Sequence, residues 1–328
     1  MLLQRRENIS ARENGRKPKS LTEIDFLLGI QDISRMGAIR FKTDEEGVFL
    51  ASEESSVPPW TTIRELENTS YIFEKNDFDV KKEKEYLNIL LKPGSSLSDA
   101  RPKATVQDQK SNLWITKFPS HKDSIDTGAW EMTVHELAKM CGINVPEALC
   151  RRFSNNGSTF LVKRFDRTDD NKRIHFVSAM TMLGRIDGDD SSSYLDIVGV
   201  LNQKGSKPME DKKELWKIIV FSIAVSNTDD HLRNHGFLFD SKGLRLSPMY
   251  DVNPNQNGSC LSLSIDGLDN SLDFDIAIDA APYFGVKKDE GTSIIKEIKE
   301  KVSLFRYIAG KYEISQSEIN RMESAFNI

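Results

Sequence analysis

Hydrophobic and polar positions follow different patterns in the two halves of the chain. Before residue 167, short runs rich in β-branched and aromatic residues alternate with helical stretches, which is typical of a small mixed sheet with accompanying helices. After residue 167, apolar residues recur with a helical period along most of the chain. The pattern therefore predicts an α+β fold with a mixed-sheet N-lobe (residues 1–166) and a helical C-lobe (residues 167–328).

The same patterns give approximate bounds for each element. Strands are expected at residues 38–41, 47–51, 113–118, 148–153 and 159–165, with a hairpin at 237–239 and 244–246. Helices are expected at residues 22–28, 60–67, 80–91, 130–141, 177–183, 194–201, 212–226, 275–284, 292–308 and 316–326. The helix at 212–226 is apolar on nearly all sides from Ile218 onward, which predicts a central buried helix.

The apolar runs and the first twenty residues indicate where in the cell the protein is expected. The longest strongly apolar run, residues 218–225, is far shorter than the roughly 20 residues that cross a bilayer, so no membrane interaction is expected. The first twenty residues are too polar for the apolar core of a secretory signal, and we expect a cytoplasmic protein. We interpret this basic stretch as a solvated arm, with a binding role as the alternative. Its basic residues are Arg5, Arg6, Arg12, Arg16, Lys17 and Lys19.

Composition and charge narrow the possible functions. The 328 residues, enough for about two domains, carry 45 lysines and arginines against 50 aspartates and glutamates, a formal charge of −5. Because nucleic-acid binding relies on positive charge, direct sequence-specific DNA binding is not expected. The three cysteines form no CxxC pair and therefore predict no metal or redox site.

The strongest chemical signal follows the apolar helix. Asp229 and Asn234 are five positions apart, the separation of the base and the metal-binding amide in the D-x-x-x-x-N loop of protein kinases. Asp251 follows 22 positions after Asp229, beyond the predicted hairpin, where a second metal-holding group would lie. Phosphoryl transfer needs a carboxylate that accepts the hydroxyl proton and hard oxygen ligands for Mg²⁺. The alternative is an acid-rich turn that caps a helix and faces solvent.

Residues of the N-lobe support the phosphoryl-transfer interpretation. Lys117, within the predicted strand LWITKF, is a candidate for the lysine that holds the α- and β-phosphates of ATP. Glu131, at the start of the next helix, is the candidate for its ion-pair partner, and Glu136 is the rival on the same helix. The run LVKRFDR ends the predicted sheet, so its backbone could present hydrogen-bonding groups to an adenine edge.

Five motifs together resemble the HipA family of bacterial toxin serine/threonine kinases, in the family's order and near its spacing. They are ARPKA (100–104), TKF (116–118), VKRFDR (162–167), TDDHLRNHGF (228–237) and LSPMYD (246–251), and the similarity extends from about residue 16 to the C-terminus. The resemblance implies a two-lobed kinase-like fold that binds ATP and Mg²⁺. It assigns Asp229 as the catalytic base, Lys117 as the phosphate-binding lysine, Asn234 and Asp251 as Mg²⁺ ligands, the backbones of Lys163 and Phe165 as adenine contacts, and His231 and Tyr250 as pocket residues.

The chain is similar to the short HipT type, which lacks an N-terminal subdomain of roughly a hundred residues. In systems of that type, a separate small protein resembles the missing subdomain, and a helix-turn-helix antitoxin supplies DNA binding. The resemblance therefore implies a HipB-like DNA-binding antitoxin and a HipS-like small protein as partners. It also implies a toxin whose substrate is a protein, with an aminoacyl-tRNA synthetase as the candidate.

The expected phosphate loop departs from the glycine-rich pattern of protein kinases. Gly94 is followed by serines instead of the further glycines of G-x-G-x-x-G. Ser96 and Ser98 resemble the autophosphorylated Ser-x-Ser motif of the short type, and a phosphate there would oppose nucleotide binding through charge repulsion. An ordinary solvated loop is the alternative. Two other functions also stay open, a catalytically silent partner-binding module and a small-molecule phosphotransferase.

Overall fold

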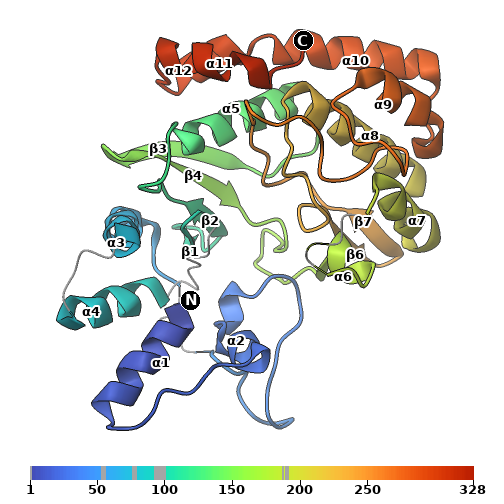
Figure 1. The fold of residues 1–328 in the computed structure, drawn as a ribbon. Helices are drawn as coiled ribbons and strands as arrows, with labels where there is room; N and C mark the ends of the chain where they lie inside the picture. Colours follow the sequence, from blue (N-terminus) through green and yellow to red (C-terminus); the bar gives the residue numbers. More distant parts are fainter. Residues whose placement is uncertain (1, 53–56, 76–79, 92–100, 187, 189–191) are drawn as a thin grey trace. The chain divides into compact units, whose positions relative to one another are not determined.

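The chain forms two compact units, each composed of two segments (Figure 1). The computed structural model describes residues 2–52, 57–75, 80–91, 101–186, 188 and 192–328. The first unit contains Met1–Gly128 and Ala148–Arg173, and the second contains Ala129–Glu147 and Ile174–Ile328. The lobe boundary expected between residues 166 and 167 stays a prediction.

The first unit is built on a four-stranded sheet that confirms three predicted strands. The sheet is antiparallel throughout rather than mixed, because β1 and β2 form a hairpin, as do β3 and β4, and β2 pairs antiparallel with β4. The sequence analysis missed β1, which directly follows a turn-rich segment. In spatial order the strands are β1 (Lys103–Gln107), β2 (Leu113–Lys117), β4 (Gly157–Lys163) and β3 (Ala148–Ser154).

Helix α3 (Ile63–Lys75) packs against one face of this sheet and continues the 3₁₀ turn η2 (Trp60–Thr62). Ile63 and Leu66 pack with Trp114 of β2 and with buried residues of β1 and β4. Side chains alternate between the two faces of a strand, so Lys117, three positions after Trp114, lies on the face opposite α3. The packing of α3 therefore leaves the Lys117 face of the sheet to other groups.

The interpretation of the first twenty residues as a solvated arm agrees with residues 14–20, which are exposed and lie outside any helix, but it is wrong for residues 2–13. They form helix α1 (Leu2–Glu13), which packs against α4 (Val80–Leu91; Figure 1, blue and teal). Leu2 and Ile9 of α1 are buried with Phe73, Leu87 and Leu90 in a small apolar cluster. Burial of this apolar stripe stabilises the helix. Arg6 and Arg12 are exposed, whereas the guanidinium of Arg5 lies 4.8 Å from the ring centroid of Phe73.

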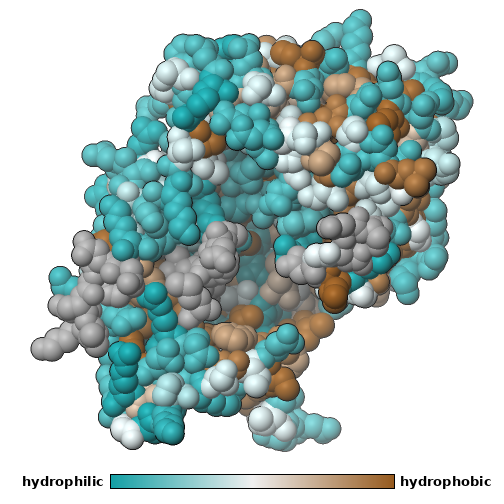
Figure 2. Space-filling view, viewed as in Figure 1, coloured by the Kyte–Doolittle hydropathy of each residue, from teal (hydrophilic) through white to brown (hydrophobic). Residues whose placement is uncertain are grey.

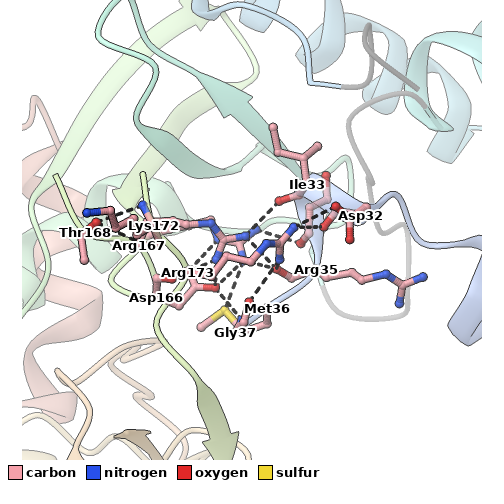
Figure 3. A network of polar contacts seen from close by, with 12 residues as sticks. Asp32, Ile33, Arg35, Met36, Gly37, Asp166, Arg167, Thr168, Lys172 and Arg173 are labelled. Carbon is pink, nitrogen blue, oxygen red and sulfur yellow. Dashed lines mark hydrogen bonds and ion pairs between the residues drawn. The ribbon is translucent and has the colours of Figure 1, made fainter. Parts of the chain in front are cut away.

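Residues 31–41, here called the strap, contain the 3₁₀ turn η1 (Asp32–Ser34) and no strand. The strand predicted at residues 38–41 is therefore wrong, as is the one predicted at 47–51. Arginine side chains from the segment after β4, rather than a neighbouring strand, satisfy the carbonyl groups of the strap (Figure 3). Arg164 donates to the carbonyls of Ser34 and Arg35 (both 2.8 Å), Arg167 to that of Ile33 (3.1 Å) and Arg173 to that of Asp32 (2.6 Å).

The carboxylate of Asp166 lies at the centre of this network (Figure 3) and is fully buried. It accepts hydrogen bonds from Arg164 (2.7 Å), from Arg167 (2.6 Å) and from the backbone N–H of Gly37 (2.6 Å). Burial by itself raises the pKa of Asp166, but its hydrogen bonds and the charges of Arg164 and Arg167 lower that pKa below the ordinary value. An ionised carboxylate thus fixes the strap to the segment that follows β4.

Helix α8 (Pro208–Ala224) is the central buried helix of the second unit, as predicted. It contacts three other helices, α7 (Tyr194–Lys204), α9 (Phe274–Ala280) and α10 (Lys288–Val302). All four helices are labelled in Figure 1. Trp216 is fully buried, and its indole N–H donates to the carbonyl of Ala277 at 2.8 Å. The apolar surface of α8 is therefore covered from several sides.

Two predicted helices of the C-lobe are wrong in part. Residues 176–178 form strand β5 (Phe176–Ser178), because they pair with β6 (Gly236–Asp240); β6 pairs in turn with β7 (Gly243–Leu246) in the expected hairpin. The helix predicted at 292–308 is divided at residues 303 and 304 into α10 and a second helix. The remaining elements are α2 (Glu23–Gly29), α5 (Thr127–Met140), α6 (Ala179–Met182), α11 (Phe305–Lys311), α12 (Gln316–Arg321), η3 (Ala281–Phe284) and η4 (Met322–Ala325).

The surface is mainly polar on the face shown in Figure 2, where hydrophobic residues form small separate groups among hydrophilic ones. Within the described residues, no helix combines the length and the apolar character that crossing a membrane requires.

Candidate active site

The loop that carries Asp229 begins at the buried end of α8. At the end of α8, the N–H of Val225 donates a hydrogen bond to the carbonyl of Phe221 at 3.0 Å. The next residue, Ser226, has a φ of +48°. This left-handed conformation is uncommon for residues other than glycine. Asn327, near the C-terminus, donates to Ile223 O at 2.7 Å and to Ser226 Oγ at 3.2 Å. The loop therefore starts from a helix end that is held by packing and by hydrogen bonds.

A compact turn brings Asn234 back to Asp229. The carbonyl of Asp229 accepts from Asn234 Nδ2 at 2.8 Å and from the backbone N–H of His231 at 3.0 Å. Because this bond uses the amide nitrogen of Asn234, its Oδ1 is the atom that can take a metal ion. The side chain of Asp229 is 88% exposed, so its carboxylate is accessible from solvent.

Asp230 and His235 lie buried beside this turn, and the sequence analysis did not identify them. Both side chains are 4% exposed, and His235 Nε2 lies 2.9 Å from Asp230 Oδ1. The hydroxyl groups of Tyr194 (2.6 Å) and Ser222 (3.3 Å) donate to Asp230 Oδ2. Burial raises the pKa of Asp230, but the charge of His235 and these hydrogen bonds lower it below the ordinary value. The only sequence signal is the spacing, because Asp230 and His235 repeat the five-residue separation of Asp229 and Asn234.

Hydrogen bonds on both sides of Asp251 hold it at the same loop. On one side, the hydroxyl of Tyr250 donates to the carbonyl of Arg233 at 2.6 Å. On the other side, the backbone N–H of Asn253 donates to Asn227 Oδ1 at 3.2 Å. Asp251 itself has a φ of +59°, in the left-handed region. Conformations of this kind cost free energy in a non-glycine residue and cluster at functional sites, because the surrounding structure must hold them.

The two residues expected to line the pocket have defined surroundings in this loop. His231 Nε2 lies 3.9 Å from Asp229 Oδ1 and 3.3 Å from Arg233 Nη2, and its side chain is 28% exposed. The ring of Tyr250 meets that of Phe176 edge-on, with ring centroids 6.4 Å apart. Burial, together with the nearby charges of Asp251 and Asp230, raises the pKa of Tyr250. Its hydroxyl therefore stays protonated at neutral pH and supports the loop as a donor.

By their chemistry, the amide oxygen of Asn234 and the carboxylate of Asp251 are ligand types that suit a magnesium ion. Carboxylate and amide oxygens are hard ligands, and Mg²⁺ is usually bound through one or two such groups together with water and substrate phosphates. Across the described part of the chain, no cluster of three or more histidine, cysteine, aspartate or glutamate residues could hold a metal ion.

Lys117 and Lys163, two of the residues expected to contact the nucleotide, are the last residues of β2 and β4 in the first unit. Lys117 pairs in register with Lys103 and Phe160. Its side chain is buried, with Nζ 5.8 Å from the ring centroid of Phe160. Lysines on sheets are commonly exposed on edge strands, and lysines are rarely buried. The burial of Lys117 therefore favours a specific role for it.

The segment expected to contact adenine begins at the end of β4. Lys163 is the last residue of β4 and pairs with Trp114, and its Nζ lies 3.4 Å from Asp169. The next residue, Arg164, donates its backbone N–H to the carbonyl of Leu113 at 2.9 Å. Phe165 then lies between Arg164 and Asp166, both of which belong to the network that binds the strap. The roles of the Lys163 and Phe165 backbones stay predictions.

Helix α5 carries both candidate partners of Lys117. Glu131 is 3% exposed and belongs to the second unit, whereas Lys117 belongs to the first. Glu136 is bound elsewhere, because its carboxylate accepts from Lys311 at 2.9 Å and from the hydroxyl of Tyr312 at 2.7 Å. These contacts disfavour Glu136 as the rival, and the pairing of Glu131 with Lys117 stays a prediction. Ser96, Ser98 and the rest of the expected phosphate loop lie outside the described residues.

Comparison with curated sequences finds relatives that are named as kinases. "Putative kinase Y4mE" of Sinorhizobium fredii is 28% identical over 148 residues, which are 42% of this chain and 33% of that protein. A "Putative kinase" of Haemophilus influenzae is 27% identical over 134 residues, or 37% of this chain and 39% of that protein. The matches thus span between a third and two fifths of the length of these relatives.

A family model and a solved structure cover more of the chain. The family model described as "HipA-like C-terminal domain" matches residues 95–304. HipA of Shewanella oneidensis MR-1, solved in a complex with HipB and its operator DNA, superposes with a TM-score of 0.63 at 16% identity. This superposition covers 97% of the present chain and 80% of that chain. The likeness confirms the α+β, kinase-like fold class expected from the sequence.

Proposed function

Because the chain belongs to the family of HipA-like C-terminal domains, we propose that it is an ATP- and Mg²⁺-dependent serine/threonine protein kinase. The observation that carries this proposal is the placement of Asp251. Hydrogen bonds from Tyr250 to Arg233 and from Asn253 to Asn227 hold it at the turn that contains Asp229 and Asn234. A base and two oxygen ligands at one loop are the set that phosphoryl transfer requires.

Asp229 acts as the base in the proposed reaction. Its carboxylate accepts the proton of the substrate hydroxyl while that oxygen forms a bond to the γ-phosphorus of ATP. The bond from the γ-phosphorus to the bridging oxygen breaks, and ADP leaves. The hydrogen bond from Asn234 Nδ2 holds the backbone of Asp229 in place, and thus the point from which its carboxylate extends. Precise placement of reacting groups is a large part of catalysis in this reaction class.

Asn234 and Asp251 would hold Mg²⁺, and Lys117 would bind the α- and β-phosphates. The bound metal ion supplies positive charge that offsets the charge of the phosphates. The buried position of Lys117 at the end of β2 supports its role, since a desolvated ammonium interacts more strongly with an anion. Glu131 would orient Lys117, the backbones of Lys163 and Phe165 would meet adenine, and His231 and Tyr250 would complete the pocket.

The biological role is proposed from family membership. We propose the toxin of a toxin-antitoxin system, with a HipB-like DNA-binding antitoxin and a HipS-like small protein as partners. The solved complex of Shewanella HipA with HipB and operator DNA supports the first partner. The proposed substrate is a serine or threonine of a protein, with an aminoacyl-tRNA synthetase as the candidate. Phosphorylation of Ser96 or Ser98 by the chain itself would then oppose ATP binding.

Transfer of label from ATP tests the proposed function. The purified chain is incubated with γ-labelled ATP and Mg²⁺, alone and with a bacterial lysate, and phosphoamino acids are analysed. We expect phosphoserine or phosphothreonine on the chain itself or on a lysate protein, and no label after chelation of Mg²⁺. Peptide mapping of residues 94–103 shows whether Ser96 or Ser98 carries the label. Label on a metabolite alone would indicate a small-molecule phosphotransferase, and ATP binding without transfer would indicate a silent module.

Replacement of Asp251 with asparagine tests the magnesium site separately. Asparagine tolerates the left-handed conformation of this position, so the loop should keep its backbone while one negative ligand is lost. We expect the Mg²⁺ concentration for half-maximal transfer to rise about 10- to 100-fold, as for weakened metal sites generally. Thermal unfolding should be unchanged. An Asp251→Asn variant with the wild-type Mg²⁺ requirement would exclude Asp251 as a ligand.

A further inference from the structure

We propose that Asp230, together with Tyr194 and His235, positions the catalytic loop for phosphoryl transfer. This inference rests on the proposed kinase function and identifies the groups that hold the Asp229–Asn234 pair in place. None of the three residues is proposed to touch substrate or metal. They act through the neighbouring residues in the chain.

The loop contains two parallel pairs of residues. Asp229 and Asn234 are joined by a hydrogen bond at 2.8 Å, and Asp229 faces solvent. The residues that immediately follow each of them, Asp230 and His235, meet at 2.9 Å in the interior. Each proposed functional residue is therefore covalently attached to one member of a buried pair, and a shift of the pair would move both.

Asp230 connects the loop to two helices. Tyr194, the first residue of α7, donates its hydroxyl to Asp230 at 2.6 Å, and Ser222 of α8 donates at 3.3 Å. Tyr194 and Ser222 are both fully buried. The ring of Tyr194 also meets that of His235 edge-on, with centroids 5.6 Å apart. A single carboxylate thus joins α7, α8 and the residue that precedes β6.

The free energy of burying this carboxylate argues for a role beyond stability. Removing a charge from water is costly, and apolar replacements of buried ion pairs are often neutral or stabilising. Hydrogen bonds to such a charge instead fix direction, because each donor must lie along an oxygen lone pair. The packing of α8 against α7, α9 and α10 does not involve Asp230 and would persist without it. The network is therefore suited to set the loop's position on a core that folds by other contacts.

Backbone hydrogen bonds also hold the loop, but they position it less precisely than the side-chain network of Asp230 does. The N–H of Ala179 donates to the carbonyl of His235 at 2.9 Å, and that of Met180 donates to the carbonyl of Leu232 at 3.2 Å. These bonds retain the general course of the chain when a side chain is changed. Displacements of about 1 Å can nevertheless lower a rate 100-fold, so the side-chain network can matter for transfer even when the fold persists.

Tyr194→Phe is the decisive variant, because it removes one donor to Asp230 and keeps the ring that contacts His235. Tyr312→Phe is the matched control, since it removes a hydroxyl that donates to Glu136 at 2.7 Å elsewhere in the same unit. We expect Tyr194→Phe to lower kcat about 10- to 100-fold with the KM for ATP changed less than about twofold. The control should keep the kcat of the wild type, and both variants should show similar Tm values. Asp230→Asn, if it folds, should lower kcat at least as far.

Hydrogen exchange of the backbone amides gives a second readout that does not depend on activity. In Tyr194→Phe, amides of residues 229–234 should exchange faster than in Tyr312→Phe, while those of α8 keep their protection. Unchanged exchange at 229–234, or a kcat equal to that of the control, would overturn the positioning role. Absence of transfer by the wild-type chain would instead count against the proposed kinase function, and the exchange result would still decide the role of the network.

Discussion

Asp229→Asn is expected to lower the rate of phosphoryl transfer about 10²- to 10⁴-fold, the usual contribution of a positioned general base. The asparagine side chain has nearly the same shape but cannot accept the proton of the hydroxyl group. The turn should persist, because Asn234 and His231 bind the backbone carbonyl of Asp229 and not its carboxylate. Binding of ATP with Mg²⁺ should therefore change less than about twofold, so kcat and kcat/KM should fall together. Labelled transfer and calorimetry measure the two quantities.

Asp279→Asn provides the matched control for this variant. Asp279 is also an exposed aspartate of the second unit, with its side chain 76% exposed and paired with Lys288 at 2.6 Å. Surface pairs of this kind contribute little, so transfer by the control should equal that of the wild type. Equal rates for Asp229→Asn and wild type would remove Asp229 as the base. A loss of ATP binding in parallel with rate would indicate disruption of the site instead.

Asp166→Ala is expected to reduce the free energy of unfolding by about 3–5 kcal/mol, the cost typical of removing one partner from a buried ion pair. The variant leaves Arg164 and Arg167 with side chains 2% and 6% exposed and without the carboxylate they share. The N–H of Gly37 loses its acceptor as well. Urea unfolding followed by tryptophan fluorescence measures the loss.

Two further variants serve as controls in that experiment. Asp169→Ala tests the effect of removing a nearby carboxylate that is exposed, and Asp166→Asn tests the effect of removing only the charge. Asp169 lies three positions further along the same segment, and its side chain is 99% exposed, so its removal should change stability by less than about 0.5 kcal/mol. Asp166→Asn retains an acceptor but loses the charge, and its stability should lie between those of the other two variants. Equal stability of Asp166→Ala and Asp169→Ala would show that the strap does not depend on the carboxylate.

The pKa of Asp166 also predicts how this stability depends on pH. The pKa is lowered in the folded protein, so the ionised form favours folding at pH values above the unfolded-state pKa of about 4. The contribution is lost as the pH falls through the lower, folded-state pKa. The stability difference between wild type and Asp166→Asn should therefore be full at neutral pH and should narrow in acid below about pH 4. A difference that is constant from neutral to acidic pH would contradict the assignment.

The pattern of hydrophobic and polar residues predicted helices and strands correctly where an element buries one face against elements that are near it in the sequence. The strands at Lys117 and Lys163 and the buried helix α8 are of this kind. The errors lie where partners distant in sequence decide. Residues 176–178 became a strand because β6, some sixty residues later, pairs with them. The strap is irregular because arginines from the segment after β4 bind its carbonyls.

The candidate site divides in the same way. The spacing of Asp229, Asn234 and Asp251 pointed to one loop cluster, because residue type and separation are properties of the sequence. For the supporting residues, the sequence held only the repeated five-residue spacing of Asp230 and His235. Asp230 and His235 look like any other polar residues of a turn, and Tyr194 lies 36 positions before Asp230. Their importance follows only from burial, which places the carboxylate of Asp230 between the hydroxyl donors of Tyr194 and Ser222 and the ring of His235.

The sequence by itself determined the fold class, the buried helix α8 and the order of the chemical motifs, since apolar periodicity and residue spacing act over short distances along the chain. Tertiary structure alone decided that α1 packs on α4, that Gly37 binds Asp166 from 129 positions away, and that Asp251 adopts a left-handed conformation. The physical reason is that a buried polar group must find its partner wherever the fold brings one close, and a one-dimensional pattern does not record that distance.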